Sequence, residues 1–122
     1  MNRVVVTGIG MVSPLASNVN DTWSQLLKSK SGINQITSFN TEDLNVKIAG
    51  QIPGKEEQFG FNAEDYVEPK DQRKIDDFIL YAIAAADQAI MDSEIGNLDE
   101  ETSKRAGVLI GSGSVATPFA DA

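Results

Sequence analysis

The sequence contains no cysteine and no histidine among its 122 residues. Without cysteine the chain forms no disulfide and carries out no thiol chemistry, and without histidine it lacks the commonest general base of enzymes. The same two absences remove the usual ligands of zinc and other transition metals. The composition therefore predicts a chain with no metal site and no ordinary acid–base catalyst of its own.

Basic residues are also scarce, with ten lysines and arginines against eighteen aspartates and glutamates, which gives a formal net charge of −8. This balance argues against binding nucleic acid or an anionic membrane through overall charge, although it leaves room for a local basic patch. No apolar run approaches the length of a membrane-spanning helix, and the one near the N-terminus is too short for a signal peptide. We therefore expect a cytoplasmic protein.

The order of predicted elements is that of an α/β protein, with the size of one small domain or part of a larger one. Residues 3–7 and 106–110 are short apolar runs, which are typical of strands buried on both faces. Asn18 predicts the N-cap of a helix over residues 19–28. The apolar face of that helix would comprise Val19, Trp23, Leu26 and Leu27. Residues 46–52 suggest a short edge strand, and residues 62–68 suggest a single helical turn. The simplest sheet consistent with this order pairs the two apolar strands, 3–7 and 106–110, in parallel.

The clearest helix is predicted over residues 70–93, and Pro69 suits its first turn. Its apolar residues recur at helical spacing, so that one face should be buried: Ile75, Ile79, Ala82, Ala86 and Ala89. Few strongly polar residues interrupt the stretch from 79 to 91, which favours burial on more than one side.

The residues around this helix give weaker signals. Tyr66 and Tyr81 are interpreted as packing residues, as is the tryptophan of the first helix. We expect the chain to turn at Gly96 after the helix ends. Asn97 followed by Glu100 resembles a capping box, which predicts a short acidic helix.

Three of the ten basic residues, Lys70, Arg73 and Lys74, lie within five positions at the start of the long predicted helix. Positive side chains at the positive end of a helix macrodipole oppose the local field, and such a combination would suit an anion. The alternative is an ordinary solvated helix start whose charge three nearby aspartates partly offset. From the residues alone, the second interpretation is favoured.

Each predicted apolar strand ends in a pair of glycines, Gly8 with Gly10 and Gly111 with Gly113. The carboxyl ends of parallel strands are where α/β proteins bind ligands. A dinucleotide-binding loop at Gly8 is a weak alternative because the third glycine of that fingerprint is missing; the glycines more simply let backbone pass close to a neighbouring element. Ser112 could line a pocket, but no histidine exists to activate it as a nucleophile.

Four stretches together resemble the N-terminal part of a β-ketoacyl-acyl-carrier-protein synthase, a condensing enzyme of fatty-acid synthesis, and the likeness is closest to the synthase II type. They are RVVVTGIGMVSPL at residues 3–15, TWSQLLKSKSGI at 22–33, DQRKIDDFILYAIAAADQAIMDS at 71–93 and RAGVLIGSG at 105–113. Each stretch is weak alone, but their order and spacing are those of the family. The resemblance covers nearly the whole chain up to Gly113.

The resemblance implies a thiolase-like fold of stacked α-β-α-β-α layers, usually in a homodimer, of which residues 1–122 would be the first part without separate domains. It implies decarboxylative condensation of malonyl-carrier protein with an acyl chain held as a thioester on a cysteine, with no cofactor. The family's catalytic cysteine and two histidines lie downstream of the positions present here. We therefore expect an N-terminal segment that contains no catalytic residue and is inactive alone.

The resemblance also implies two sites. Lys70, Arg73 and Lys74 match the basic residues with which synthase II enzymes contact the acidic acyl carrier protein, and this reverses the preference stated above for a merely solvated helix start. Gly111, Ser112 and Gly113, with the following Ser114, match positions that line the acyl pocket. The sequence departs from the family after Gly113, so the acyl chain-length preference stays open.

Two other functions are considered. The chain could be a non-catalytic, stand-alone module that binds an acidic protein partner through the same three basic residues. A weaker alternative is a nucleotide-binding domain that uses Gly8 and Gly10.

Overall fold

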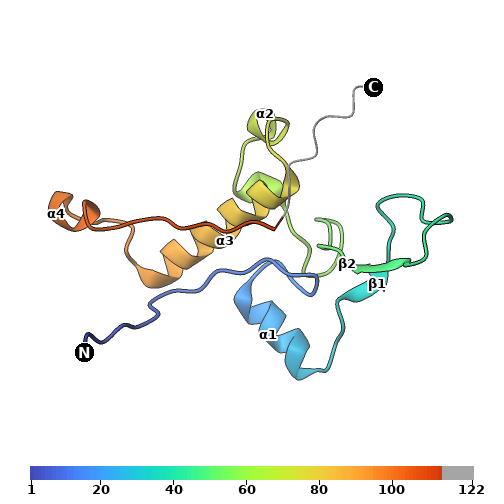
Figure 1. The fold of residues 1–122 in the computed structure, drawn as a ribbon, viewed down its shortest axis with the longest axis horizontal. Helices are drawn as coiled ribbons and strands as arrows, with labels where there is room; N and C mark the ends of the chain where they lie inside the picture. The colour runs from blue at the N-terminus through green and yellow to red at the C-terminus, as the bar shows by residue number, and fades with distance from the viewer. Residues whose placement is uncertain (114–122) are drawn as a thin grey trace.

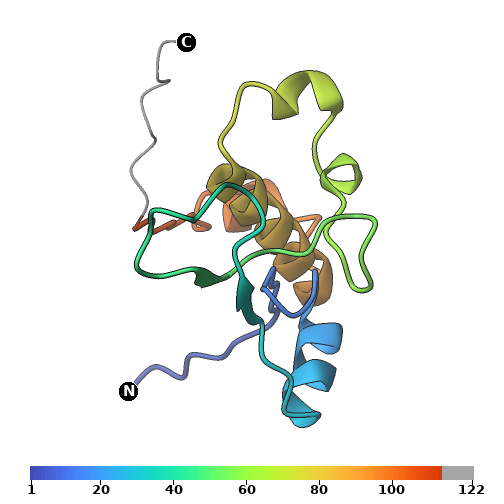
Figure 2. The same cartoon turned by 90° about the vertical axis from the view of Figure 1, so that its right-hand side faces the viewer.

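The computed structural model of the protein describes residues 1–113. Its elements, in chain order, are α1 (Val19–Leu27), β1 (Ile33–Gln35), β2 (Ile48–Gly50), the 3-10 helix η1 (Ala63–Asp65), α2 (Pro69–Gln72), α3 (Asp77–Ser93) and α4 (Glu100–Ser103). The long helix α3 forms the centre, and α2 projects from it on a loop (Figure 1). The N-terminal residues extend away from this body (Figures 1 and 2).

The predicted N-cap at Asn18 and the predicted helical turn within residues 62–68 are both confirmed. The side-chain oxygen of Asn18 accepts a hydrogen bond from the backbone N–H of Asp21 at 2.9 Å and caps α1. Asn62 accepts from the N–H of Glu64 at 3.3 Å and caps η1. Pro69 occupies the first turn of α2, where its missing N–H costs nothing. Each of these signals depends only on residues within one helical turn.

The sheet within residues 1–113 is an antiparallel pair, β1 with β2, in which Ile33 lies opposite Gly50 and Gln35 opposite Ile48. The predicted edge strand over residues 46–52 is confirmed in its central part by β2. Its partner β1 was not predicted, because three residues are too few to show an alternating pattern.

The two predicted apolar strands are absent, so the expected parallel pairing is wrong for the described residues. Residues 3–7 and 106–110 have no strand assignment, and Val4 and Leu109 are 90% and 99% exposed. A strand has no internal hydrogen bonds and forms only beside a partner strand, whatever its own preference. No such partner lies beside either run in residues 1–113.

The predicted helix over residues 70–93 is interrupted. Asp76 has extended backbone (φ −76°, ψ 158°) and separates α2 from α3, and Asp77 lies in the first turn of α3. Acidic residues are favourable at a helix N-terminus, so this pair starts a new helix and leaves the basic residues outside it.

The predicted end of the long helix at Ser93 and the short acidic helix after it are confirmed, but the residues that close the first and cap the second are not the predicted ones. Helix α3 ends because Glu94 adopts a left-handed conformation (φ 58°), so the turn begins before the expected Gly96, which lies in a bend. Asp99, not Asn97, caps α4 by accepting a hydrogen bond from the N–H of Thr102 at 2.7 Å. Aspartate satisfies an N-terminal N–H as well as asparagine does, and Asp99 directly precedes the first residue of α4.

The core centres on Phe61, Leu80 and Ala84. Tyr66 stacks on Phe61 with ring centroids 5.7 Å apart, and Tyr81 meets the same ring edge-on at 5.2 Å, so their predicted packing roles are confirmed. We call these five residues, with the half-buried residues packed against them, the core cluster. The half-buried members are Val12, Ile52, Ala63, Val67 and Ile75.

The predicted buried faces of the two main helices are partly wrong. Trp23 on α1 is 60% exposed, and the residues of α1 that are buried are Thr22 and Gln25. On α3, Leu80 and Ala84 face the core cluster, whereas Ile79 and Ala86 are exposed. Because α3 is apolar around most of its circumference, its sequence alone does not select which side is covered.

Residues 8–17 lie against α3. A Cβ at Gly10 would stand 2.8 Å from the backbone nitrogen of Ala89, so only glycine allows this approach, as expected from the sequence. Gln88 fixes the contact: its Oε1 accepts from the N–H of Met11 at 3.0 Å, and its Nε2 donates to the carbonyl of Ser17 at 2.7 Å and to Tyr66 Oη at 3.0 Å. Gln88 therefore holds the N-terminal segment to α3 at Met11 and Ser17.

Candidate functional site

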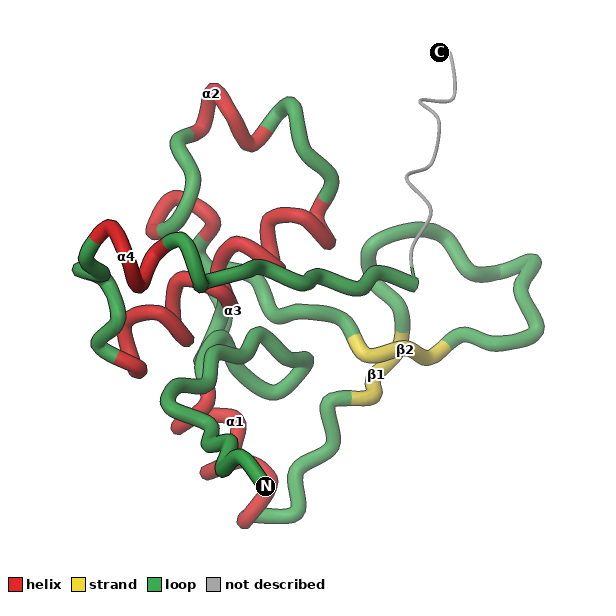
Figure 3. Tube along the Cα trace, turned by 60° about the vertical axis from the view of Figure 1, so that its left-hand side comes forward, coloured by secondary structure: helices red, strands yellow, loops and turns green. Residues whose placement is uncertain are grey.

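The basic residues lie on a projecting part of the molecule. We define the basic segment as residues 70–74, in which Lys70 belongs to α2 and Arg73 and Lys74 lie in the turn that follows. All three basic side chains are exposed, and α2 lies at the far end of its loop in every view of the chain (Figures 1 and 3). The structure thus brings the three predicted docking residues together on one accessible surface.

The electrostatic reason first considered for this site does not hold. Helix α2 has four residues, and α3 begins after the basic segment with an aspartate in its first turn. The three cations therefore do not stand at the positive end of the long helix macrodipole. Any anion binding here would depend on the side chains themselves.

The turn that carries these side chains is anchored on both sides. Before it, Val67 packs against the core cluster and its carbonyl accepts a hydrogen bond from Gln72 Nε2 at 2.6 Å. After it, Ile75 packs against the same cluster. The backbone of the basic segment is therefore held between two core contacts while its charged side chains reach solvent.

Two of the three cations are paired within the segment. Lys70 Nζ lies 2.8 Å from Glu68 Oε2, and Lys74 Nζ lies 2.8 Å from Asp71 Oδ1. Arg73 makes no ion pair with any residue in the described part of the chain. Sequence reasoning recognised that aspartates would offset this charge but missed Glu68, which a two-residue spacing to Lys70 could have suggested.

The three predicted acyl-pocket residues that the structure describes are exposed. At Gly111 and Gly113, nothing in the described structure lies within 4 Å of the position a Cβ would take. Ser112 is exposed as well, and Ser114 lies outside the described residues. A pocket at these positions stays a prediction.

The glycine loop near the N-terminus is committed to α3. The N–H of Ile9 donates to Asp92 Oδ2 at 2.9 Å, and the N–H of Met11 donates to Gln88 Oε1 at 3.0 Å. These are the backbone donors that a phosphate would need, and one already faces a carboxylate. This geometry counts against the nucleotide-binding alternative.

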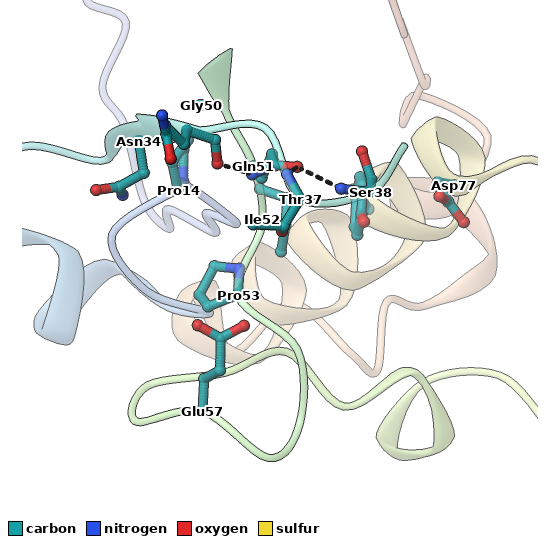
Figure 4. A pocket seen from close by; sticks show the side chains of 12 residues that line it. Pro14, Asn34, Thr37, Ser38, Gly50, Gln51, Ile52, Pro53, Glu57 and Asp77 are labelled. Carbon is teal, nitrogen blue, oxygen red and sulfur yellow. Dashed lines mark hydrogen bonds between the residues drawn. The ribbon is translucent and has the colours of Figure 1, made fainter. Parts of the chain in front are cut away.

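A polar cleft of about 530 Å³ lies between the β1–β2 hairpin and the start of α3 (Figure 4). Gln51 spans it, with Oε1 accepting from the N–H groups of Thr37 (3.1 Å) and Ser38 (3.2 Å) and Nε2 donating to the carbonyl of Gln35 (3.1 Å). Burial, and secondly the charge of Asp77, raise the pKa of Tyr81 at its wall. These bonds already occupy the amide of Gln51, which holds residues 35–38 in place. We therefore assign no ligand to this cleft.

Two further properties were examined within residues 1–113. No group of three or more acidic side chains is arranged to hold a metal ion there. None of the helices in this part of the chain has the length and apolar character needed to cross a membrane.

The combination of sequence pattern and arrangement corresponds to one class of protein. The family model described as "Beta-ketoacyl synthase, N-terminal domain" matches residues 1–121, and the chain belongs to this family.

Curated relatives make the likeness more specific. Proteins named 3-oxoacyl-[acyl-carrier-protein] synthase 2 are 48% identical over 93% of this chain in Rhizobium meliloti, 45% over 91% in Vibrio cholerae and 41% over 91% in Staphylococcus aureus (strain COL). The chain spans about a quarter of the length of these relatives, 27% in the first and 25% in the other two.

A solved structure supports the relation. The structure titled "The ishigamide ketosynthase/chain length factor" matches with a TM-score of 0.59 and 28% identity, over 80% of this chain and 22% of that chain. About four-fifths of the chain therefore follows the course of part of that ketosynthase structure.

Proposed function

We propose that this chain is the N-terminal part of a β-ketoacyl-acyl-carrier-protein synthase of the synthase II type. Such an enzyme elongates acyl chains in fatty-acid biosynthesis by decarboxylative Claisen condensation with malonyl-carrier protein. The observation that carries this proposal is the 41–48% identity to proteins named 3-oxoacyl-[acyl-carrier-protein] synthase 2, over nearly all of the chain.

The reaction cannot be carried out by these residues alone. Condensation of this kind needs a nucleophile to hold the acyl chain as a thioester and groups to stabilise developing charge, and the family uses a cysteine and two histidines. This chain has neither residue type. Its contribution would be structural, together with part of the surface that receives the carrier protein.

The layered thiolase-like fold and the homodimer belong to the same proposal. Residues 3–7 and 106–110 have strand-forming sequences but are exposed here, as are Ile79 and Ile83 on the outer side of α3. Large apolar side chains gathered in this way are usually covered in the functional protein. A sheet that included both runs and packed on α3 would cover them.

Within that enzyme we propose that the basic segment contributes to carrier-protein docking. Its three cations are exposed and clustered in a chain whose net charge is −8. Their charge would complement an acidic carrier protein, and the contacts would weaken as salt screens them.

Charge reversal tests the docking function. In the intact protein, the double variant Arg73→Glu with Lys74→Glu should weaken binding of acyl carrier protein about tenfold or more at low salt, because two attractive contacts become repulsive. Lys104→Glu is the control, since it reverses an exposed lysine on α4, away from the basic segment. Binding is measured by calorimetry at several salt concentrations. Unchanged affinity of the double variant at low salt would remove the docking assignment.

A stand-alone binding module is the second candidate, since the same exposed cations would serve it. A module of this length should be monodisperse and should unfold in one cooperative transition. Part of a larger enzyme should instead associate through its exposed apolar residues and lack a sharp transition. Analytical ultracentrifugation and urea unfolding of the 122-residue chain distinguish the two.

A further inference from the structure

We infer that Glu68 and Asp71 compete with an acidic partner for the basic segment, and that Arg73 is the contact on which docking chiefly depends. This inference rests on the proposed docking function and adds to it an internal control of affinity. The family resemblance assigns no role to Glu68 or Asp71.

The ion pairs within the segment carry the argument. Both Lys70–Glu68 and Lys74–Asp71 have N–O distances of 2.8 Å, so both lysines are in direct contact with a carboxylate of their own chain. The side chains of the first pair are 73% and 70% exposed, and those of the second 70% and 47%. The surface that would meet an acidic partner therefore already carries two negative charges.

The Glu68 carboxylate is available for this pairing because it does not cap the helix. Glu68 occupies the N-cap position of α2, yet its side chain makes no capping hydrogen bond. Asp71 is three residues from Lys74 and faces it across one helical turn. Both competitors are thus linked to their lysines by a few bonds, which gives them a high effective concentration.

Arg73 differs from both lysines. It makes no ion pair within residues 1–113, so its guanidinium can receive a partner carboxylate without first releasing one. A guanidinium also offers paired donors that match both oxygens of a carboxylate. Arginine should therefore contribute more to docking than either lysine beside it.

The competition should be modest and measurable. Exposed ion pairs are weak, so a partner can displace them, but each must be broken or shared before the lysine engages. Removing a carboxylate frees the lysine and also removes a repulsion against an acidic partner. We expect Asp71→Asn and Glu68→Gln each to tighten binding of acyl carrier protein about two- to fivefold at low salt.

The chain offers a matched control. Glu100 pairs with Lys104 at 2.7 Å on α4, and both side chains are exposed, so Glu100→Gln changes the net charge by the same amount and breaks an equivalent pair elsewhere. Binding of acyl carrier protein is measured for the intact protein with Asp71→Asn, Glu68→Gln or Glu100→Gln. The same measurement is made for Arg73→Ala, Lys70→Ala and Lys74→Ala. Circular dichroism of each variant verifies that helix content is retained.

The results distinguish a failure of this inference from a failure of the proposed docking function. The inference is supported if Asp71→Asn and Glu68→Gln tighten binding, Glu100→Gln does not, and Arg73→Ala weakens binding more than either lysine variant. The inference is overturned if Glu100→Gln tightens binding equally, because net charge alone would then explain the effect. It is also overturned if neither Asp71→Asn nor Glu68→Gln has an effect while Arg73→Ala still weakens binding. If none of the three alanine variants changes affinity, the docking function itself fails.

Discussion

Gln88 offers the sharpest test of how this chain is held together. Its amide joins three parts of the chain: Met11 and Ser17 from the N-terminal segment, and Tyr66, which stacks on Phe61 in the core cluster. Two of these hydrogen bonds span 77 and 71 residues of sequence. We predict that Gln88→Ala loosens the contact of residues 11–17 with α3, whereas the hydrogen bond from Ile9 to Asp92 is retained.

The size of the effect follows from the three bonds. Each intramolecular hydrogen bond contributes roughly 0.5–1.5 kcal/mol net, and a group left without a partner in a half-buried site adds to the loss. Alanine returns a few tenths of a kcal/mol through its better helix propensity. We therefore expect the free energy of unfolding, measured in the intact protein, to fall by roughly 2–3 kcal/mol.

Urea unfolding of the intact protein, followed by circular dichroism, measures this loss. Gln58→Ala is the matched control, because Gln58 is exposed and its side chain makes no hydrogen bond within residues 1–113. Tyr66→Phe removes one of the three bonds while keeping the ring, so a double-mutant cycle with Gln88→Ala should show a coupling of about 0.5–1 kcal/mol. If Gln88→Ala were no more destabilising than Gln58→Ala, the reasoning about this contact would be wrong.

Two further predictions concern helix ends. Glu94 closes α3 with φ of 58°, a conformation that costs a side chain and suits glycine, so Glu94→Gly should stabilise the chain by about 1 kcal/mol. The same change at Glu101, inside α4, should destabilise it, and a higher urea midpoint for both variants would argue against this explanation. Asp99 caps α4, and its hydrogen bonds to Thr102 lower its pKa from the ordinary 3.8. Its capping contribution is therefore present above that ordinary value and is lost as the pH falls through the lowered pKa of the folded state. An NMR titration of the Thr102 amide should follow this loss in the wild type and not in Asp99→Asn, which keeps the acceptor without the charge.

The long central helix illustrates what periodicity can and cannot predict. Its existence and its end at Ser93 follow from an apolar stretch rich in alanine. Its start does not, because Asp76 and Asp77 form a better N-terminus than the basic residues before them. Its buried side does not either, since Leu80 and the exposed Ile79 are equally apolar.

The candidate docking site likewise has features that the sequence predicts and features that it does not. The sequence identified Lys70, Arg73 and Lys74 as a group, and their proximity in the chain made their spatial grouping certain. Which of them carries a free charge was decided by the conformation of the turn, which sets Glu68 and Asp71 against the two lysines. The sequence pattern does not specify the direction in which the Glu68 and Asp71 side chains point.

The sequence by itself determined the features that depend on neighbouring residues: the cap at Asn18, the helical turn within residues 62–68, the proline at the start of α2, the absence of thiol and imidazole chemistry, and the family resemblance. The tertiary structure alone decided which face of α3 is covered and whether residues 3–7 and 106–110 pair as strands. Helix caps are satisfied within one turn, whereas a strand or a buried face needs surface contributed by distant parts of the chain.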